Sequence, residues 1–244
     1  KANQAWEAVG NPVTGATISN IRTMAFDANG DLYVGGNFTN LAGIANADYF
    51  AKYNVAAGTW SKVGSGISGG TKIYTIAISP EGTIFIGGDF NTAGGNTNCN
   101  YIAYFDKTAN NWRPLSTGLN QRVLTLRFAP DGKLLIGGDF TNADGTNGDY
   151  ICWWDGSAFK SFTSLGAAEL NGVVWSIDIN PNGTIIIGGT FTNAGGDSNA
   201  DSVAAWRGNN WGSLMAGGVN GLVNEVYCAN NGDIYLGGSF TQAG

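Results

Sequence analysis

Apolar and polar residues alternate over short stretches of this chain, and the stretches return at a regular distance. The clearest set is VLTLRF at 123–128, KLLIGGDF at 133–140 and YICWW at 150–154, with a fourth short stretch at 159–162. A two-residue period rich in β-branched and aromatic side chains is typical of β-strands. Between the first two stretches, Pro130 presets φ and Gly132 allows a positive φ, which favours a tight turn. The pattern predicts a unit of four short antiparallel strands.

The same unit recurs five times along the chain, about fifty residues apart. Each copy carries a glycine pair, then any residue, then phenylalanine; the pairs are Gly35–Gly36, Gly87–Gly88, Gly137–Gly138, Gly188–Gly189 and Gly237–Gly238. A recurring four-stranded unit of this length is typical of the blades of a β-propeller. We therefore predict an all-β fold, a five-bladed β-propeller of four-stranded antiparallel blades. The blades are expected at about residues 21–64, 73–116, 123–163, 174–215 and 223–244 plus 1–10.

The two ends of the chain complement each other. The fifth copy stops at Gly244, just after its second strand, whereas Trp6–Gly10 resembles a fourth strand. We expect the N- and C-termini to share the last blade of a single domain, residues 1–244. Because the third strand of that blade has no counterpart, we expect the chain to be a fragment of a longer polypeptide. An internal piece of a larger propeller is the alternative.

The glycine pairs predict close packing between neighbouring blades. Glycine weakens a strand unless another part of the protein must approach it closely. A phosphate-binding loop would need a helix N-terminus after the glycines, and the chain instead continues in the β pattern. Third strands are expected to begin at Tyr49, Tyr101 and Ser202, and most tryptophans and tyrosines are expected to anchor the packing of the blades.

Composition narrows the chemistry. The chain has 12 basic and 18 acidic residues, a net charge of −6 and no histidine. Nucleic-acid binding normally leaves a basic footprint, and histidine is the commonest general base and transition-metal ligand. We therefore expect no nucleic acid partner, no metal, no cofactor and no catalytic residue. We also expect no insertion into a membrane, because no apolar run approaches the length of a membrane helix.

Three cysteines, Cys99, Cys152 and Cys228, occupy different positions of the repeat and form no CxxC pair. This arrangement favours neither a disulfide framework nor a zinc site. We expect isolated and mostly buried thiols, since cysteine packs as a small hydrophobic residue.

Candidate contact residues lie in the longer loops. The loops from second to third strands and those between blades share one face of the predicted propeller, and binding residues favour such loops. An acid or an amide recurs there; the candidate ligand-binding residues are Asn46, Asp48, Asn98, Asn100, Asn147, Asp149, Asn199 and Asp201. These side chains either bond the local backbone in Asx-type turns or form a ring of polar groups for a glycan or a protein. Calcium coordination by oxygen ligands is a minor variant.

The repeat resembles known propeller families. Its key stretches are GGNFTNLAG at 35–43, GGDFNTAGG at 87–95, GGDFTNADG at 137–145 and GGTFTNAGG at 188–196. They are similar to kelch-type repeats, and closer to the Gly-Gly-x-Phe-Thr repeats of bacterial and viral surface propellers and of fungal cortical polarity markers. The resemblance implies a surface or virion protein that binds other macromolecules. Kelch-type propellers include a copper oxidase of galactose whose metal site uses histidines, so that activity does not carry over.

Three classes of function follow from these observations. The first is a non-enzymatic extracellular, cell-surface or virion propeller, a structural and interaction module of a larger chain or assembly, with a protein or glycan partner on the long-loop face. The alternative is a multivalent lectin, with similar sugar sites in successive repeats. The third is a glycoside-active enzyme, for which Asp178 and Glu225 on first strands near the expected axis are the candidate channel acids.

Overall fold

The regular secondary structure of the described part of the chain is almost entirely β-strand. The computed structural model describes residues 8–10, 15–143, 145, 148–166 and 168–244. The first four-stranded sheet contains β1 (Thr17–Phe26), β2 (Leu32–Thr39), β3 (Phe50–Asn54) and β4 (Thr59–Ser61). The second contains β6 (Lys72–Ile78), β7 (Ile84–Asp89), β9 (Ile102–Asp106) and β10 (Asn111–Pro114).

Two further four-stranded sheets follow in chain order. The third contains β11 (Val123–Phe128), β12 (Leu134–Gly138), β13 (Ile151–Trp154) and β14 (Phe159–Ser161). The fourth contains β15 (Val174–Ile179), β16 (Ile185–Gly189), β17 (Val203–Trp206) and β18 (Trp211–Gly212). Two small sheets complete the set: β19 (Leu222–Cys228) with β20 (Ile234–Ser239), and β5 (Ile67–Ser68) with β8 (Thr92–Ala93).

Helical structure in the described residues is limited to short 3-10 turns, η1 (Leu41–Gly43), η2 (Phe162–Leu165) and η3 (Ala194–Gly196). None of the helices in this part of the chain is both long and apolar enough to cross a membrane.

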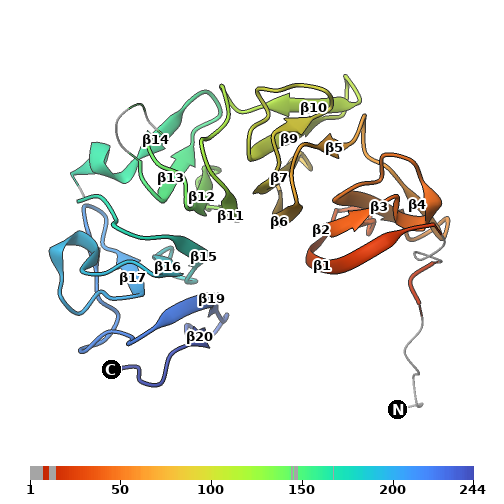
Figure 1. Cartoon of the computed structure of the whole chain (residues 1–244). Coiled ribbons are helices and arrows are strands. Elements are labelled where there is room, and N and C mark those ends of the chain that lie inside the picture. Colours follow the sequence, from red (N-terminus) through yellow and green to blue (C-terminus); the bar gives the residue numbers. More distant parts are fainter. Residues whose placement is uncertain (1–7, 11–14, 144, 146–147, 167) are drawn as a thin grey trace, which may run out of the picture.

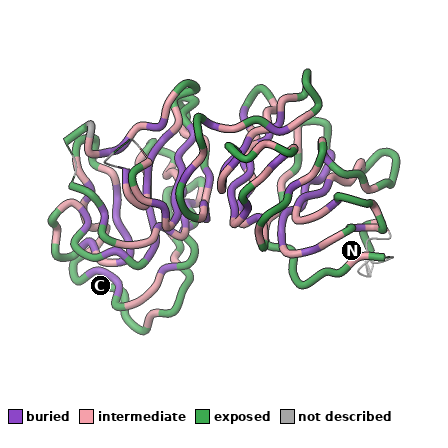
Figure 2. The backbone as a smooth tube through the Cα atoms, turned by 45° about the horizontal axis from the view of Figure 1, so that its top comes forward, coloured by how far each residue is buried: buried purple, intermediate pink, exposed green. Residues whose placement is uncertain are grey.

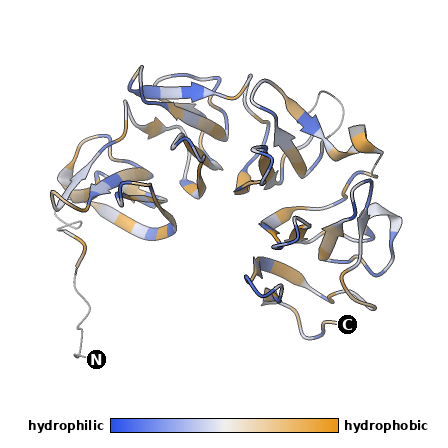
Figure 3. Cartoon of the chain, turned by 180° about the vertical axis from the view of Figure 1, so that it is seen from behind, coloured by the Kyte–Doolittle hydropathy of each residue, from blue (hydrophilic) through white to orange (hydrophobic). Residues whose placement is uncertain are grey.

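The sheets stand side by side around an arc (Figure 1), and the same arc is visible from behind in Figure 3. Their first strands, β1, β6, β11, β15 and β19, lie nearest the middle, and each contacts the next along the arc. The predicted all-β fold of four-stranded antiparallel units is therefore confirmed. The number of five blades and the last blade shared by the two termini stay predictions.

The hydrophobic core lies within and between successive sheets (Figure 2). The phenylalanines that follow the glycine pairs are buried in it: Phe38, Phe90, Phe140 and Phe191 are at most 1% exposed. The fifth, Phe240, directly follows β20 of the two-stranded sheet and is only partly buried. Burying one such side chain stabilises a fold by about 1.5–3 kcal/mol. The three cysteines are also buried, as expected.

The glycine pairs are packing residues, as predicted, and the two members have different neighbours. In the first four pairs, a Cβ on the first glycine would collide with a β-branched side chain of the next sheet; from Gly35 it would lie 2.7 Å from Cγ2 of Ile73. A Cβ on the second glycine would collide with the backbone of its own first strand, as Gly36 would with the carbonyl of Asn20. Glycine is thus sterically required at both places in the first four pairs, whereas a Cβ on Gly237 would meet only Cβ of Glu225, at 4.0 Å.

The predicted starts of the third strands are wrong by one residue. Tyr49, Tyr101 and Ser202 have φ values of 63°, 63° and 61°, in the left-handed region, and the strands begin at the next residue. This backbone conformation is incompatible with an extended strand. The first strand also differs, because β1 begins at Thr17 and not near residue 21.

Low pH should destabilise the turn after β13, and replacing Asp155 by a neutral residue should remove this dependence on pH. Asp155 Oδ1 accepts the N–H groups of Ser157 and Ala158, each at 2.8 Å. These bonds lower the pKa of Asp155 from 3.8 to about 2. Its stabilising contribution is therefore present above pH 3.8 and is lost as the pH falls through about 2.

Asp155→Asn keeps an acceptor oxygen in the turn but does not titrate. We expect the urea midpoint of the wild type to fall more steeply than that of Asp155→Asn between about pH 4 and pH 2. Parallel midpoints across this range would contradict the assignment.

Candidate functional site

The predicted acids of the long loops bond the local backbone. Asp48, Asp149 and Asp201 each accept an N–H group through Oδ1 at 2.7 Å; the donors are Asn40, Asn142 and Asn193. The three donors have positive φ values of 50°, 60° and 51°. The carboxylates therefore hold the sharp bend after the second strand. These bonds cross the loop over seven or eight residues and so are not the Asx-type turns considered from the sequence. A role of these residues in ligand contact stays a prediction.

The predicted amides have more varied surroundings. Asn199 Oδ1 accepts the N–H of Gly217 at 3.0 Å, which ties its loop to the chain segment before β19. The carbonyl of Asn100 accepts the N–H of Leu119 at 3.1 Å. Asn98 donates its backbone N–H to Asn96 Oδ1 at 2.9 Å, and Asn46 has a φ of 64°. Asn147 lies outside the described residues.

A polar channel of about 670 Å³ runs along the middle of the arc. All the first strands contribute to its wall, from Arg22 of β1 to Glu225 of β19. Hydroxyl groups join the walls: Thr75 Oγ1 accepts the N–H of Leu126 at 3.1 Å, and Ser176 Oγ accepts that of Val226 at 3.0 Å. The channel is thus held together by hydrogen bonds between neighbouring first strands.

The two candidate channel acids are brought near each other but have different partners. Asp178 pairs with Arg127 at 2.7 Å and accepts the N–H of Cys228 at 2.7 Å, so its carboxylate is fully engaged at a buried position. Glu225 accepts the Ser176 hydroxyl at 3.2 Å. Burial raises the pKa of Glu225, and the Asp178 carboxylate adds to the rise. Asp178 therefore serves to join two strands, whereas Glu225 remains accessible from the channel.

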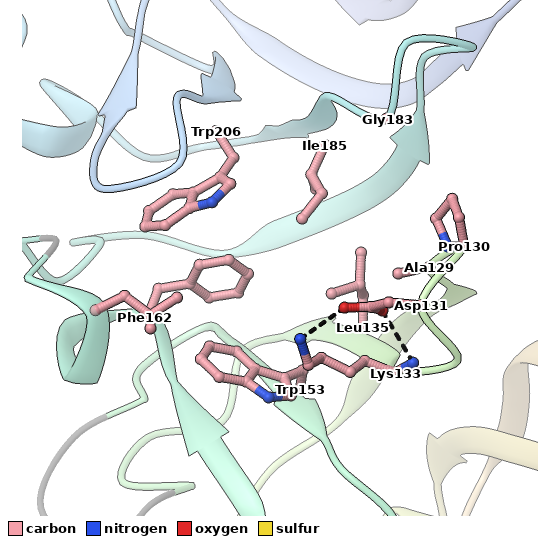
Figure 4. A pocket seen from close by; sticks show the side chains of 11 residues that line it. Ala129, Pro130, Asp131, Lys133, Leu135, Trp153, Phe162, Gly183, Ile185 and Trp206 are labelled. Atoms are coloured by element: carbon pink, nitrogen blue, oxygen red, sulfur yellow. Dashed lines mark hydrogen bonds and ion pairs between the residues drawn. The ribbon is translucent and has the colours of Figure 1, made fainter.

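A second, apolar pocket of about 320 Å³ lies between the third and fourth sheets (Figure 4). Its base is an aromatic cluster around Phe162, whose ring centroid lies 5.0 Å from that of Trp153 and 4.8 Å from that of Trp206, with interplanar angles of 77° and 70°. Such edge-to-face pairs are a favourable geometry for aromatic rings. The pocket is therefore a rigid aromatic surface supplied by two sheets.

Two oppositely charged side chains at the rim of this pocket pair with each other. Lys133 Nζ lies 2.6 Å from Asp131 Oδ2 and 6.0 Å from the centre of the Trp153 ring. Leu165 also lines the pocket and is 49% exposed. Since the two charged side chains at the rim pair with each other, the pocket offers an apolar ligand a surface without an unpaired charge.

Sequence reasoning missed this pocket. Most tryptophans, Trp153 and Trp206 included, were expected to anchor blade packing, and the longer loops were expected to carry the site. The pocket instead opens near the tight turns between first and second strands, at Ala129–Asp131 and Gly183. A usable signal was present, because aromatic residues recur at the ends of third strands and two sheets bring them together.

Comparison with protein families gives partial matches to two propeller domains. Residues 70–144 match the Rax2 C-terminal beta propeller domain, and residues 180–204 match a beta-propeller domain of unknown function, DUF5122. No curated protein matches the chain in sequence.

Solved structures give similarity over most of the chain at low identity. The extracellular domain of a one-component system from B. thetaiotaomicron has a TM-score of 0.61 at 13% identity; the alignment covers 91% of this chain but only 26% of that one. YCF48 bound to D1 peptide has a TM-score of 0.56 at 11% identity, with 96% of this chain and 66% of that one covered. A gluconolactonase from Xanthomonas campestris has a TM-score of 0.53 at 11% identity, with 89% and 69% covered. At these identities the similarity concerns the fold, and together with the sheets it identifies the chain as a β-propeller.

Proposed function

We propose that this chain is a non-enzymatic, extracellular propeller module that binds a protein partner through the apolar pocket between the third and fourth sheets. The observation that carries the proposal is the aromatic cluster of Trp153, Phe162 and Trp206 beneath an opening of side-chain size. Buried aromatic and aliphatic anchors in such pockets dominate the affinity of protein interfaces. The expected ligand is a large apolar side chain presented by the partner.

Two comparisons support this proposal without naming the partner. YCF48 is a propeller bound to a peptide, and the structure from B. thetaiotaomicron is an extracellular domain. The resemblance of the repeat to surface propellers points the same way. A sugar-binding site would need several convergent polar groups, and here the two charged side chains at the rim bond each other.

The pocket can be tested by peptide selection. We expect the wild-type chain to enrich peptides with an aromatic or large aliphatic anchor from a random display library. Leu165→Asp places a charge at the mouth without disturbing the core, because Leu165 is 49% exposed. It should weaken the selected peptides at least about tenfold, which corresponds to about 1.4 kcal/mol. Trp206→Ala should weaken them further, by removal of one wall.

Phe26→Ala is the matched control, since it removes an exposed aromatic side chain from β1, in a sheet that contributes no residue to the pocket. It should leave the same peptides bound. Peptides that bind Leu165→Asp as tightly as the wild type would count against the pocket.

We also propose that the two termini share the last blade, although most of the strand predicted at Trp6–Gly10 lies outside the described residues. Trp60 Nε1 donates to the carbonyl of Val9 at 3.0 Å, and Trp112 Nε1 donates to that of Val63 at 3.1 Å. The next residues, Gly10 and Gly64, both have positive φ, 66° and 59°. Val9 thus takes the place, one blade earlier, that Val63 takes after β4. This match of Val9 and Gly10 with Val63 and Gly64 supports a preceding blade that the N-terminal segment helps to form.

A further inference from the structure

Three pockets occupy equivalent places in successive repeats. The apolar pocket around Phe162 has one counterpart between the first and second sheets and another between the second and third, each of about 400 Å³. All three open beside the tight turns that join first to second strands. Equivalent residues line them: Tyr33, Phe85 and Leu135 on second strands, and Phe105, Trp154 and Trp206 on third strands. The chemistry of each pocket is therefore set by the side chains that the repeat varies.

The pocket between the second and third sheets is rich in aromatic side chains. Four of them line it from both sheets: Phe85 of β7, Tyr104 of β9, Phe128 of β11 and Trp154 of β13. The ring centroid of Phe85 lies 5.8 Å from that of Tyr104 and 5.5 Å from that of Phe128. All four side chains are only partly buried, so part of each ring can meet a ligand. Aromatic rings attract cations, because their faces carry negative charge.

The charges of this pocket are not balanced as they are in its apolar counterpart. The described residues that line it include two acids, Glu81 and Asp155, but no lysine or arginine. Glu81 has the repeat position of Asp131, which Lys133 pairs with at 2.6 Å in the apolar pocket. The repeat position of that lysine is occupied here by Thr83. Glu81 is exposed and forms no ion pair with another described residue, so its charge stays available to a ligand.

The second acid, Asp155, adds to this negative charge. The N–H of Ala158 and other groups of the same turn bond its carboxylate and lower its pKa to about 2, so it is ionised at neutral pH. Lys107 approaches the turn of Glu81 at Gly82, but it lines the pocket between the first and second sheets. The pocket between the second and third sheets therefore combines aromatic walls with two carboxylates.

We propose that the pocket between the second and third sheets binds an alkylammonium cation. The rings contact the methyl or methylene groups of the cation, and Glu81 and Asp155 offset its charge. A volume of about 400 Å³ suits such a group, since sites for small ligands span roughly 300–1,000 Å³. A lysine side chain of a protein, methylated or not, and a free quaternary ammonium compound offer the same chemistry. The pocket is separate from the apolar one, so a negative result leaves the proposed function unaffected.

Choline and its uncharged analogue, in which carbon replaces the nitrogen, separate recognition of charge from burial of an apolar group. In an NMR titration of the purified chain, choline should shift the indole N–H signal of Trp154 saturably. The signal of Trp206, in the apolar pocket, should stay unchanged. The uncharged analogue should bind at least about fivefold more weakly, because it lacks the charge that rings and carboxylates attract. Equal binding of the two compounds would overturn the proposal.

Thr83→Lys gives the pocket the lysine that its apolar counterpart has. The new ammonium group should pair with Glu81, as Lys133 pairs with Asp131 in the equivalent turn. Because this internal cation competes with the ligand for the same charge, the affinity for choline should fall at least about tenfold. Thr184→Lys places the same charge in the equivalent turn of the fourth sheet and is the matched control. It should change the affinity by less than about twofold, since charges at a distance are screened.

Glu81→Gln tests the carboxylate without adding a side chain, and it too should weaken choline severalfold. A short peptide that contains trimethyllysine identifies the source of the cation. Tighter binding of the peptide than of choline supports a protein side chain, and tighter binding of choline supports a free cation. Unchanged affinity for choline in both Thr83→Lys and Glu81→Gln would overturn the proposal, as would a folded chain that binds neither probe.

Discussion

Replacing Phe140 by alanine should lower the free energy of unfolding by about 3–5 kcal/mol. The Phe140 side chain is completely buried in a cluster that includes Val123 and Ile136. Its removal loses the transfer free energy of the ring and leaves a cavity that close-packed neighbours cannot fill. Urea unfolding followed by tryptophan fluorescence measures the change.

Phe240→Ala is the matched control for this substitution. Phe240 has the same place in the repeat, directly after β20 of the two-stranded sheet, but is only partly buried. It should therefore cost clearly less than Phe140→Ala. Equal costs at the two positions would show that the sheets do not differ in packing as described.

Gly188→Ala should destabilise the chain by about 1–3 kcal/mol although it adds a single methyl group. The new Cβ would lie 2.6 Å from Cγ1 of Val223 and 2.7 Å from Cγ2 of Val226. Both valines belong to β19 and are buried, so relief of the contact requires the fourth sheet to move away from β19. The same urea titration applies.

Gly212→Ala, by contrast, should raise the free energy of unfolding. The nearest atom to a Cβ at Gly212 is 3.7 Å away, an ordinary van der Waals distance. Alanine at a compatible position stabilises by about 0.4–1 kcal/mol, because it restricts the unfolded chain. If Gly188→Ala changed the free energy of unfolding by no more than Gly212→Ala does, the role assigned to the glycine pairs would be contradicted.

Local and periodic features of the fold were predictable from the sequence. The glycine pair, the tight turn at Pro130 and Gly132 and the four strands of a unit recur at fixed distances, so one copy supports the interpretation of the others. The start of each third strand was not predictable to the residue, because nothing in the pattern indicates that Tyr49 and Tyr101 adopt a positive φ. That conformation follows from hydrogen bonds that join the glycine pair to the residue just ahead of the third strand.

The contacts between sheets were less accessible to sequence reasoning. Arg127 and Asp178 have the same place in consecutive first strands, so an alignment of the repeats could have predicted their ion pair. The pocket could not have been predicted from such an alignment. Whether Trp206 is an internal packing residue or the wall of an opening depends on the spacing of two sheets, and periodicity carries no information about that spacing.

The central claim is that the pocket around Phe162 binds an apolar group of a protein, and one comparison tests it most directly. The wild-type chain and Leu165→Asp are applied in parallel to a glycan array and to an array of peptides with apolar anchors. The account predicts peptide binding that Leu165→Asp abolishes, and no binding to glycans. Glycan binding that Leu165→Asp abolishes would assign the pocket to a lectin instead, and peptide binding that this variant leaves unchanged would contradict the account.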